Sequence, residues 1–219
     1  MRRLLVVAIA ALGVLAAAAC QPAGGHASWL FNESSGSTAT DSAGDHDGTS
    51  SKVTLGLAGH EGTSYGFNGV DSIVRVPSSP DLNPGTSDIS FGAWVNFTTL
   101  PPPETWDVVR KGISGDEGGY YKLELFTGNG GARARCFFRD EDGTSKSVVK
   151  GNGLSDGRWH QITCSRTDDQ ITITVDGSSS SNDVALDRIA NDSVITIGGK
   201  PTGGDAFKGR LDEVRIDVG

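Results

Sequence analysis

Short runs of alternating apolar and polar residues recur along most of this chain, each bounded by Gly, Asp, Asn or Pro. Alternation with a period of two is typical of half-buried β-strands, whereas helical periodicity is hard to find after the first 20 residues. The pattern therefore predicts a single all-β domain built as a sandwich. The clearest runs are 27–33, 63–69, 72–77, 89–97, 106–112, 120–126, 132–140, 145–150, 158–166, 170–177, 193–199 and 209–216.

The N-terminal segment has the pattern of a bacterial export signal. Arg2 and Arg3 precede an apolar run, and small residues lead to Cys20. We expect residues 1–20 to be a signal peptide, 21–26 a short tether and 27–219 the folded domain. The sequence Ala-Ala-Ala-Cys at 17–20 resembles a lipobox, so Cys20 is a candidate lipidation site; the alternative is ordinary cleavage with Cys20 incidental. We expect an extracytoplasmic protein that is secreted or lipid-anchored to a bacterial cell envelope.

The cysteine count favours one disulfide. Cys136 and Cys164 are the other two cysteines of the chain, and an oxidising compartment would pair them. Lipidation of Cys20 would then account for the odd thiol. No CxxC sequence occurs, so the predicted bridge is structural.

The charge of the chain excludes some partners. Without Arg2 and Arg3 the chain keeps 17 of its 19 basic residues against 27 acidic ones, a net charge of −10. Such a balance argues against nucleic acid or an anionic membrane surface as a partner. A membrane contact is expected only through the possible lipid anchor, and the domain is expected to be a monomer.

Several strings in order resemble one known family. They are SWLFNESSGSTATDSAGDHDGT, YGFNGVDSIVRVP, ISFGAWVNF, GRWHQITCSR, ITITVDG and FKGRLDEVRI. They resemble the laminin-G-like domains of the concanavalin A-like lectin/glucanase superfamily, over residues 27–219. The resemblance implies a jelly roll of two antiparallel sheets, core positions for Trp29, Trp94 and Trp159, and a Cys136–Cys164 bridge between neighbouring strands.

The string GRLDEVRI raises the question of an inward carboxylate. Strict alternation places Asp212 on the same face as Val214 and Ile216. The same alternation places Glu33 with Trp29 and Phe31.

The resemblance implies that the first and last strands pair and hold a structural Ca²⁺ nearby, with Asp212 as the best-matched ligand. Glu33, Asp41 of the acidic loop and the Gly69 region are further candidate oxygen donors, since calcium takes six to eight oxygens. The alternative is that Asp212 pairs with Arg210 or Arg215 at a solvated rim.

Catalytic signatures are missing from the sequence. Retaining glycosidases of this superfamily need two carboxylates close together, and no strand carries acids in an alternating E-x-D-x-x-E pattern. None of the four histidines lies in a nucleophile elbow or at a zinc spacing. The sequence therefore favours a protein that is not an enzyme.

Two neighbouring runs could present a ligand surface. Alternation gathers Tyr120, Arg133 and Arg135 with other charged and aromatic side chains on one face, where arginines could donate in pairs and a tyrosine could stack. Trp106, at a loop edge, is a further candidate contact. The alternative is a solvated sheet face without a ligand.

These observations favour a non-catalytic, exported binding module that recognises a glycan or a cell-surface protein. The alternatives are a divergent glycoside hydrolase or lyase of the same fold, and a purely structural envelope protein.

Overall fold

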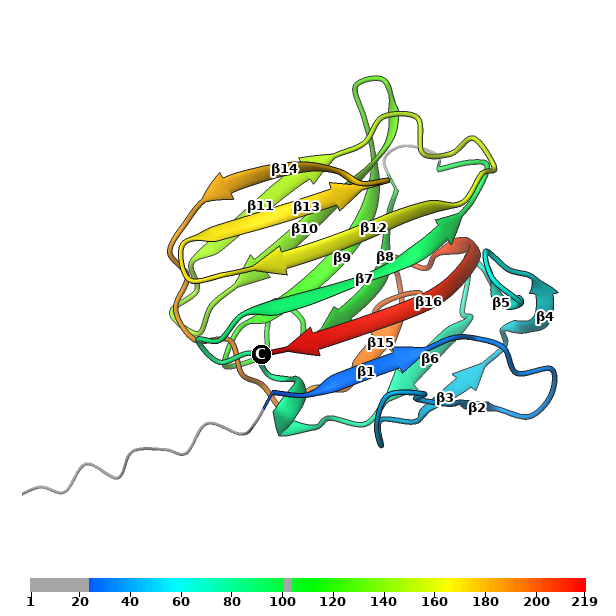
Figure 1. Cartoon of the computed structure of the whole chain (residues 1–219), viewed down its shortest axis with the longest axis horizontal. Helices are drawn as coiled ribbons and strands as arrows, with labels where there is room; N and C mark the ends of the chain where they lie inside the picture. The colour runs from blue at the N-terminus through cyan, green and yellow to red at the C-terminus, as the bar shows by residue number, and fades with distance from the viewer. Residues whose placement is uncertain (1–23, 101–103) are drawn as a thin grey trace, which may run out of the picture.

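A computed structural model describes residues 24–100 and 104–219, and within them the chain forms two antiparallel β-sheets of eight strands each (Figure 1). Because the predicted signal peptide, Cys20 and the first half of the tether lie outside the described residues, export and lipidation stay predictions. No helix among the described residues is long and apolar enough to span a bilayer. The predicted all-β sandwich is confirmed.

The front sheet, nearest the viewer in Figure 1, is centred on the last strand of the chain. Strand β16 hydrogen-bonds β7 along one edge, and β5 and β1 along the other. The predicted pairing of the first and last strands is therefore confirmed. The front-sheet strands, in spatial order, are β14 (Ser178–Asp183), β13 (Gln170–Val175), β12 (His160–Arg166), β7 (Ile89–Asn96), β16 (Lys208–Val218), β5 (Thr63–Asn68) and β4 (Thr54–Ala58), with β1 (His26–Trp29) on β16.

The back sheet lies behind it, and a short 3₁₀ turn, η1 (Pro80–Leu82), connects β6 to β7. Every pair of neighbouring back-sheet strands is antiparallel. The strands, in spatial order, are β11 (Ser145–Lys150), β10 (Gly131–Arg139), β9 (Tyr120–Gly128), β8 (Thr105–Lys111), β15 (Ile195–Ile197), β6 (Ile73–Val76), β3 (Gly48–Ser51) and β2 (Thr38–Ala39).

The core lies between the sheets, and alternation decides which side chains enter it. In β10 every second residue is buried, as the sequence pattern predicts. Phe91 of the front sheet contacts Tyr121 and Phe138 of the back sheet, with ring centroids 4.8 and 5.7 Å away. The sandwich is thus held by one continuous apolar layer.

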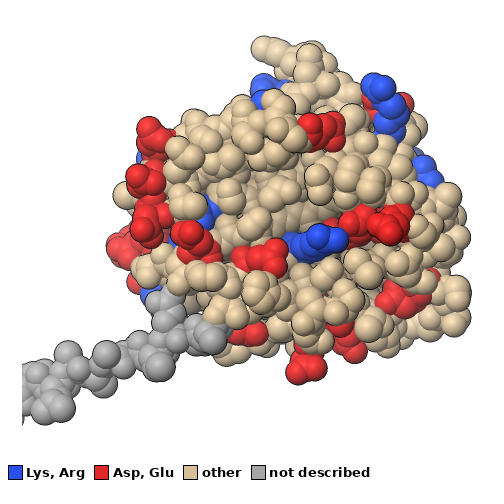
Figure 2. Space-filling model, viewed as in Figure 1, with Lys and Arg blue, Asp and Glu red and all other residues tan. Residues whose placement is uncertain are grey.

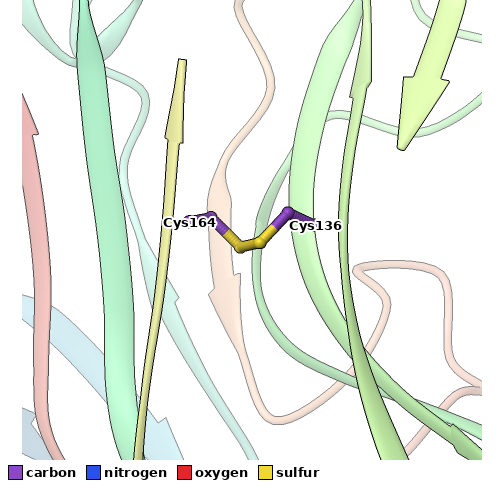
Figure 3. Close-up of a disulfide and its surroundings, with 2 residues drawn as sticks. All are labelled: Cys136 and Cys164. Carbon is purple, nitrogen blue, oxygen red and sulfur yellow. A yellow bond between two sulfur atoms is a disulfide. The ribbon is translucent and has the colours of Figure 1, made fainter. Parts of the chain in front are cut away.

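The disulfide crosses this layer. Cys136 of β10 and Cys164 of β12 are bonded with Cα atoms 5.5 Å apart, and both are fully buried. Figure 3 shows the two side chains reaching toward each other from different strands. The predicted pair is confirmed, but the two strands are not neighbours in one sheet. The bond links the front sheet to the back sheet because both residues face the core.

Removing this bond should lower stability. Replacement of both Cys136 and Cys164 with Ala is expected to reduce the free energy of unfolding by about 3 to 4 kcal/mol, because the unfolded chain loses a closed loop of about 29 residues. Urea unfolding of the wild type and the double variant, each with and without a reducing agent, measures the difference. The reductant should affect the wild type alone; equal midpoints for all four samples would contradict the prediction.

Candidate functional site

The outer face of the front sheet carries a hollow, which we call the front groove. It has a volume of about 190 Å³ and is lined by outward residues of β7, β12 and β16. In β7 the side chains of Phe91, Ala93 and Val95 are buried in the core, so the residues that alternate with them face outward. The lining includes Ser90, Gly92 and Trp94 of β7, Gln161 and Thr163 of β12, and Glu213, Arg215 and Asp217 of β16.

Gly92 allows β7 and β12 to approach each other closely at the base of the groove. A Cβ at this position would lie 2.1 Å from the carbonyl oxygen of Ile162 in the neighbouring strand. A residue with a side chain at position 92 would therefore push β7 and β12 apart. Both strands line the groove at this position. The glycine is required by this close approach of two backbones.

A β-bulge in β16 sets which side chains line the groove. Asp212 pairs with Trp94 and Arg215 with Gly92, so one extra residue lies between them. Glu213 takes up the irregularity with φ +45°. Leu211 and Val214 are consequently both buried in the core. Strict alternation across this string was therefore a wrong prediction, because the bulge reverses the parity of the strand.

Asp212 is fully buried, as predicted, but on the outer side of the sheet. The reverse turn of residues 59–62, between β4 and β5, covers it. Its Oδ2 accepts hydrogen bonds from the backbone N–H groups of His60 (2.8 Å) and Glu61 (3.1 Å), and its Oδ1 accepts one from Glu213 (2.8 Å). Burial raises the pKa of the Asp212 carboxyl above its ordinary value, against the lowering effect of these three donors.

The 59–62 turn places His60 on Trp94. The two rings are stacked with centroids 3.5 Å apart and planes 12° from parallel. His60 Nδ1 lies 2.9 Å from Glu213 Oε1, and Glu213 Oε2 accepts a hydrogen bond of 3.0 Å from Arg215. One end of the front groove is therefore an aromatic pair joined to an ordered row of charged groups.

The other end of the groove carries a second histidine–carboxylate pair. His26 Nδ1 lies 2.8 Å from Asp217 Oδ1, and both side chains are exposed. Figure 2 faces the front sheet and shows acidic side chains on both sides of a basic one across the middle of this face. Hydroxyl, amide and charged groups beside an aromatic ring are the lining that a hydrogen-bonding small ligand requires.

The groove residues were missed by the sequence reasoning, although a signal was present. The resemblance placed Trp94 in the core, whereas its alternation with Phe91 and Val95 indicates an outward position. Trp94 and Trp159 are half-buried, and Trp29 alone of these three is fully buried. His60 could not be found from sequence, since its position depends on a turn held by a residue 152 positions away.

Trp106 is placed in the core. It is 4% exposed and packs edge-on against Phe97 and Phe207, while its Nε1 donates to Glu104. The prediction of an accessible ligand contact at Trp106 is therefore not supported by its surroundings. An indole in the middle of an aromatic cluster stabilises the fold by burial.

The predicted face of Tyr120, Arg133 and Arg135 exists on the outside of the back sheet. The register pairs Arg133 with Phe126, Arg135 with Glu124 and Arg139 with Tyr120. Its groups mostly bind one another: Tyr120, 7% exposed, stacks on Phe137, while Arg135 hydrogen-bonds Glu124 and lies over Phe126. Arg133 donates to the carbonyl of Gly151. This face offers less free hydrogen-bonding capacity than the front groove.

The back sheet also holds two carboxylates on neighbouring strands. Asp107 of β8 pairs directly with Glu124 of β9. A search for acids along single strands cannot find such a pair. Both side chains are at most 1% exposed and form ion pairs with Arg110, Lys122 and Arg135. Burial raises the pKa of Asp107 despite these cations. The pair lacks the access to substrate that glycoside hydrolysis requires.

The four predicted calcium donors do not lie together as one site. Asp212 binds the 59–62 turn, and Glu33 accepts hydrogen bonds from Thr40 N–H and Tyr65 Oη, both at 2.8 Å. Asp41 binds its own loop, and Gly69 donates its N–H to Phe207. Within residues 24–100 and 104–219, no three His, Cys, Asp or Glu side chains are arranged to hold a metal ion. The donor set does not fit the calcium prediction.

Chelation tests that disagreement. We expect the melting temperature to be unchanged by EDTA, because the Asp212 oxygens already accept three backbone hydrogen bonds. Differential scanning fluorimetry with EDTA and with added Ca²⁺ measures the effect. A fall in melting temperature that Asp212→Ala abolishes would restore the calcium site.

Asp41 orders the acidic loop through hydrogen bonds. Burial alone would raise the pKa of its carboxyl, but backbone N–H donors from Ser28, Ala43 and His46, with the His46 ring, hold that pKa below its ordinary value. The His46 ring also lies 3.1 Å from Asp81 Oδ2. The loop is thereby attached to both β1 and η1.

Asp41→Asn is expected to lower the free energy of unfolding at pH 7 by about 1 to 3 kcal/mol. Because the folded-state pKa is depressed, the stabilisation is present above the ordinary pKa and is lost as the pH falls through the folded pKa. The difference between wild type and variant should therefore shrink below about pH 4. Urea unfolding across this pH range measures the difference in stability. The matched control is Asp45→Asn, at an exposed position of the same loop. A difference that does not change with pH would contradict the role given to the Asp41 carboxylate.

Comparisons with known proteins agree with this architecture. The binding domain of botulinum neurotoxin serotype D superposes with a TM-score of 0.66 at 14% identity, over 87% of this chain and 47% of that one. Domain 4 of AbnA, an extracellular arabinanase from Geobacillus stearothermophilus solved with arabinotriose, gives 0.63 at 19% identity, over 88% of this chain and 91% of that one. The mouse laminin alpha1 domains LG4-5 give 0.51 at 16% identity, over 70% and 40%.

The chain spans about half the length of the neurotoxin binding domain that it matches. No curated protein sequence matches it. A laminin-G-type family model described as the concanavalin A-like lectin/glucanases superfamily matches residues 67–217. Since this match covers more than half of the 219 residues, the protein belongs to the laminin-G-like family of the concanavalin A-like lectin/glucanases superfamily.

Proposed function

We propose that this protein is a non-catalytic glycan-binding module and that the front groove is its ligand site. The observation that carries the proposal is the stacked His60–Trp94 pair beside the Glu213–Arg215 row. Sugar rings present apolar C–H faces to aromatic rings and hydroxyl groups to charged and amide side chains. The front groove supplies both kinds of contact within one hollow.

The charge of the groove favours a neutral ligand. Strand β16 brings Glu213 and Asp217 to it against Arg215. Carboxylates can accept hydrogen bonds from paired sugar hydroxyls, whereas a uronic acid or a sulfated sugar would meet like charges here. The net charge of the whole chain is also negative. We therefore infer a preference for neutral oligosaccharides.

The similar structures support a binding role without naming the ligand of this chain. The arabinanase domain was solved with arabinotriose, and the neurotoxin structure is that of a binding domain. The Cys136–Cys164 bond is compatible with an oxidising compartment, which supports export. We propose that the module acts outside the cytoplasm on a glycan or a glycosylated surface protein.

Trp94→Ala should weaken binding of a neutral oligosaccharide by about tenfold or more, because it removes the indole that lines the groove and the ring on which His60 is stacked. Isothermal titration calorimetry with neutral arabino-, xylo- and gluco-oligosaccharides, and with an acidic oligogalacturonate, measures the affinity and the preference. The matched control is Phe137→Ala on the back sheet, which removes a stacked aromatic from the opposite face.

The outcomes separate the candidate functions. Loss of binding in the Phe137 variant with full binding in the Trp94 variant would move the site to the back sheet. Release of shorter sugars during incubation would favour a hydrolase or lyase. Full-strength binding of the acidic ligand alone would contradict the neutral preference, and no binding to any of the oligosaccharides would count against the glycan proposal.

A further inference from the structure

We propose that Asp212 is a positioning residue of the front groove, which acts through the 59–62 turn to hold His60 against Trp94. The part of this inference that concerns ligand affinity rests on the proposed function. The part that concerns the position of His60 does not.

The hydrogen bonds of Asp212 are the first step. Its donors within the described residues are three backbone N–H groups, two from the turn and one from the bulge. A buried carboxylate without a paired cation is costly, so this position needs a reason beyond packing. Both carboxylate oxygens are used as acceptors. Asparagine has the same shape but would turn an N–H₂ group toward at least one of these donors.

The geometry of the turn is the second step. The backbone N–H of His60 binds Asp212 Oδ2, while the His60 ring stacks on Trp94, which is the cross-strand partner of Asp212. The Asp212 side chain therefore holds the backbone of His60, and the His60 ring covers Trp94. Gly59 permits this approach, since a Cβ there would lie 2.6 Å from Asp212 Oδ2.

The bulge is the third step. The N–H of Glu213 binds Asp212 Oδ1, and Glu213 in turn contacts the His60 ring and Arg215. Asp212 thus holds the backbone of His60 from the turn side and, from the strand side, the backbone of Glu213, whose carboxylate contacts the His60 ring. Loss of its acceptor oxygens should release the turn and leave Trp94 uncovered, with the two sheets intact.

Nuclear magnetic resonance tests the position of His60 without a ligand. A ring stacked on an indole has its protons shifted upfield by the ring current, so the carbon-bound His60 ring protons should be shifted upfield in the wild type. Trp94→Phe identifies the source of the shift. In Asp212→Asn the shift should largely disappear, while backbone amide signals of the back sheet stay in place.

Ligand affinity provides the second measurement. Asp212→Asn and His60→Ala should each weaken binding of the neutral oligosaccharide by a similar factor, about two- to tenfold, because the His60 ring no longer orders Trp94 and Glu213 of the groove lining. The double variant should be no weaker than His60→Ala, because Asp212 acts through His60. A residue that served only general stability would not show this dependence. The matched control is Asp217→Asn, a groove carboxylate outside the Asp212 network, whose effect should add to that of His60→Ala.

Each result supports or overturns the inference. An unchanged His60 ring shift in Asp212→Asn, or an additive loss in the double variant, would overturn it. If no oligosaccharide binds to the wild type, the proposed function fails while the ring shift still decides the role of Asp212. If Asp212→Asn does not fold, Gly59→Ala displaces the same turn without changing the carboxylate, and loss of the ring shift there would support the inference.

Discussion

The structure depends on the position of the last strand, β16, in the middle of the front sheet. Its hydrogen bonds to β7 on one side and to β1 and β5 on the other leave neither edge free over most of its length. The core then receives Leu211 from before the bulge and Val214, Ile216 and Val218 from after it. A sheet completed only by its C-terminal strand gains most of its pairing from contacts distant in sequence, so the fold cannot close before both ends of the domain are present.

The bulge in β16 decides which residues of this strand face the core and which face the groove. One extra residue lets Leu211 and Val214 both enter the core, and it lets Glu213, Arg215 and Asp217 line the groove. The buried Asp212 satisfies the amides that the irregularity and the adjacent turn would otherwise leave unpaired. The same interaction thus stabilises a defect in the sheet and orders the end of the groove.

The two outer faces of the sandwich use charge differently. On the back sheet, Asp107 and Glu124 are buried beneath Arg110, Lys122 and Arg135, so the charges largely neutralise one another. Such a network contributes order at the expense of free binding capacity. Along the front groove, Thr163, Gln161 and Arg215 stand beside an aromatic pair in an open hollow. This contrast makes the front face the better candidate for a ligand.

The sequence by itself determined the all-β class, the alternating strands such as 132–140 and the Cys136–Cys164 pair, because alternation and composition act locally. It did not reveal β14, whose SSSSND has no apolar alternation and forms by pairing with β13. Nor did it reveal that the disulfide crosses the sheets, that Trp106 is buried and Trp94 lines the groove, or that Asp41 and Asp212 bind separate turns. Those outcomes were decided by the tertiary structure. A one-residue bulge reverses which face of a strand its side chains occupy, and the position of His60 depends on a hydrogen bond to a residue 152 positions away in the sequence.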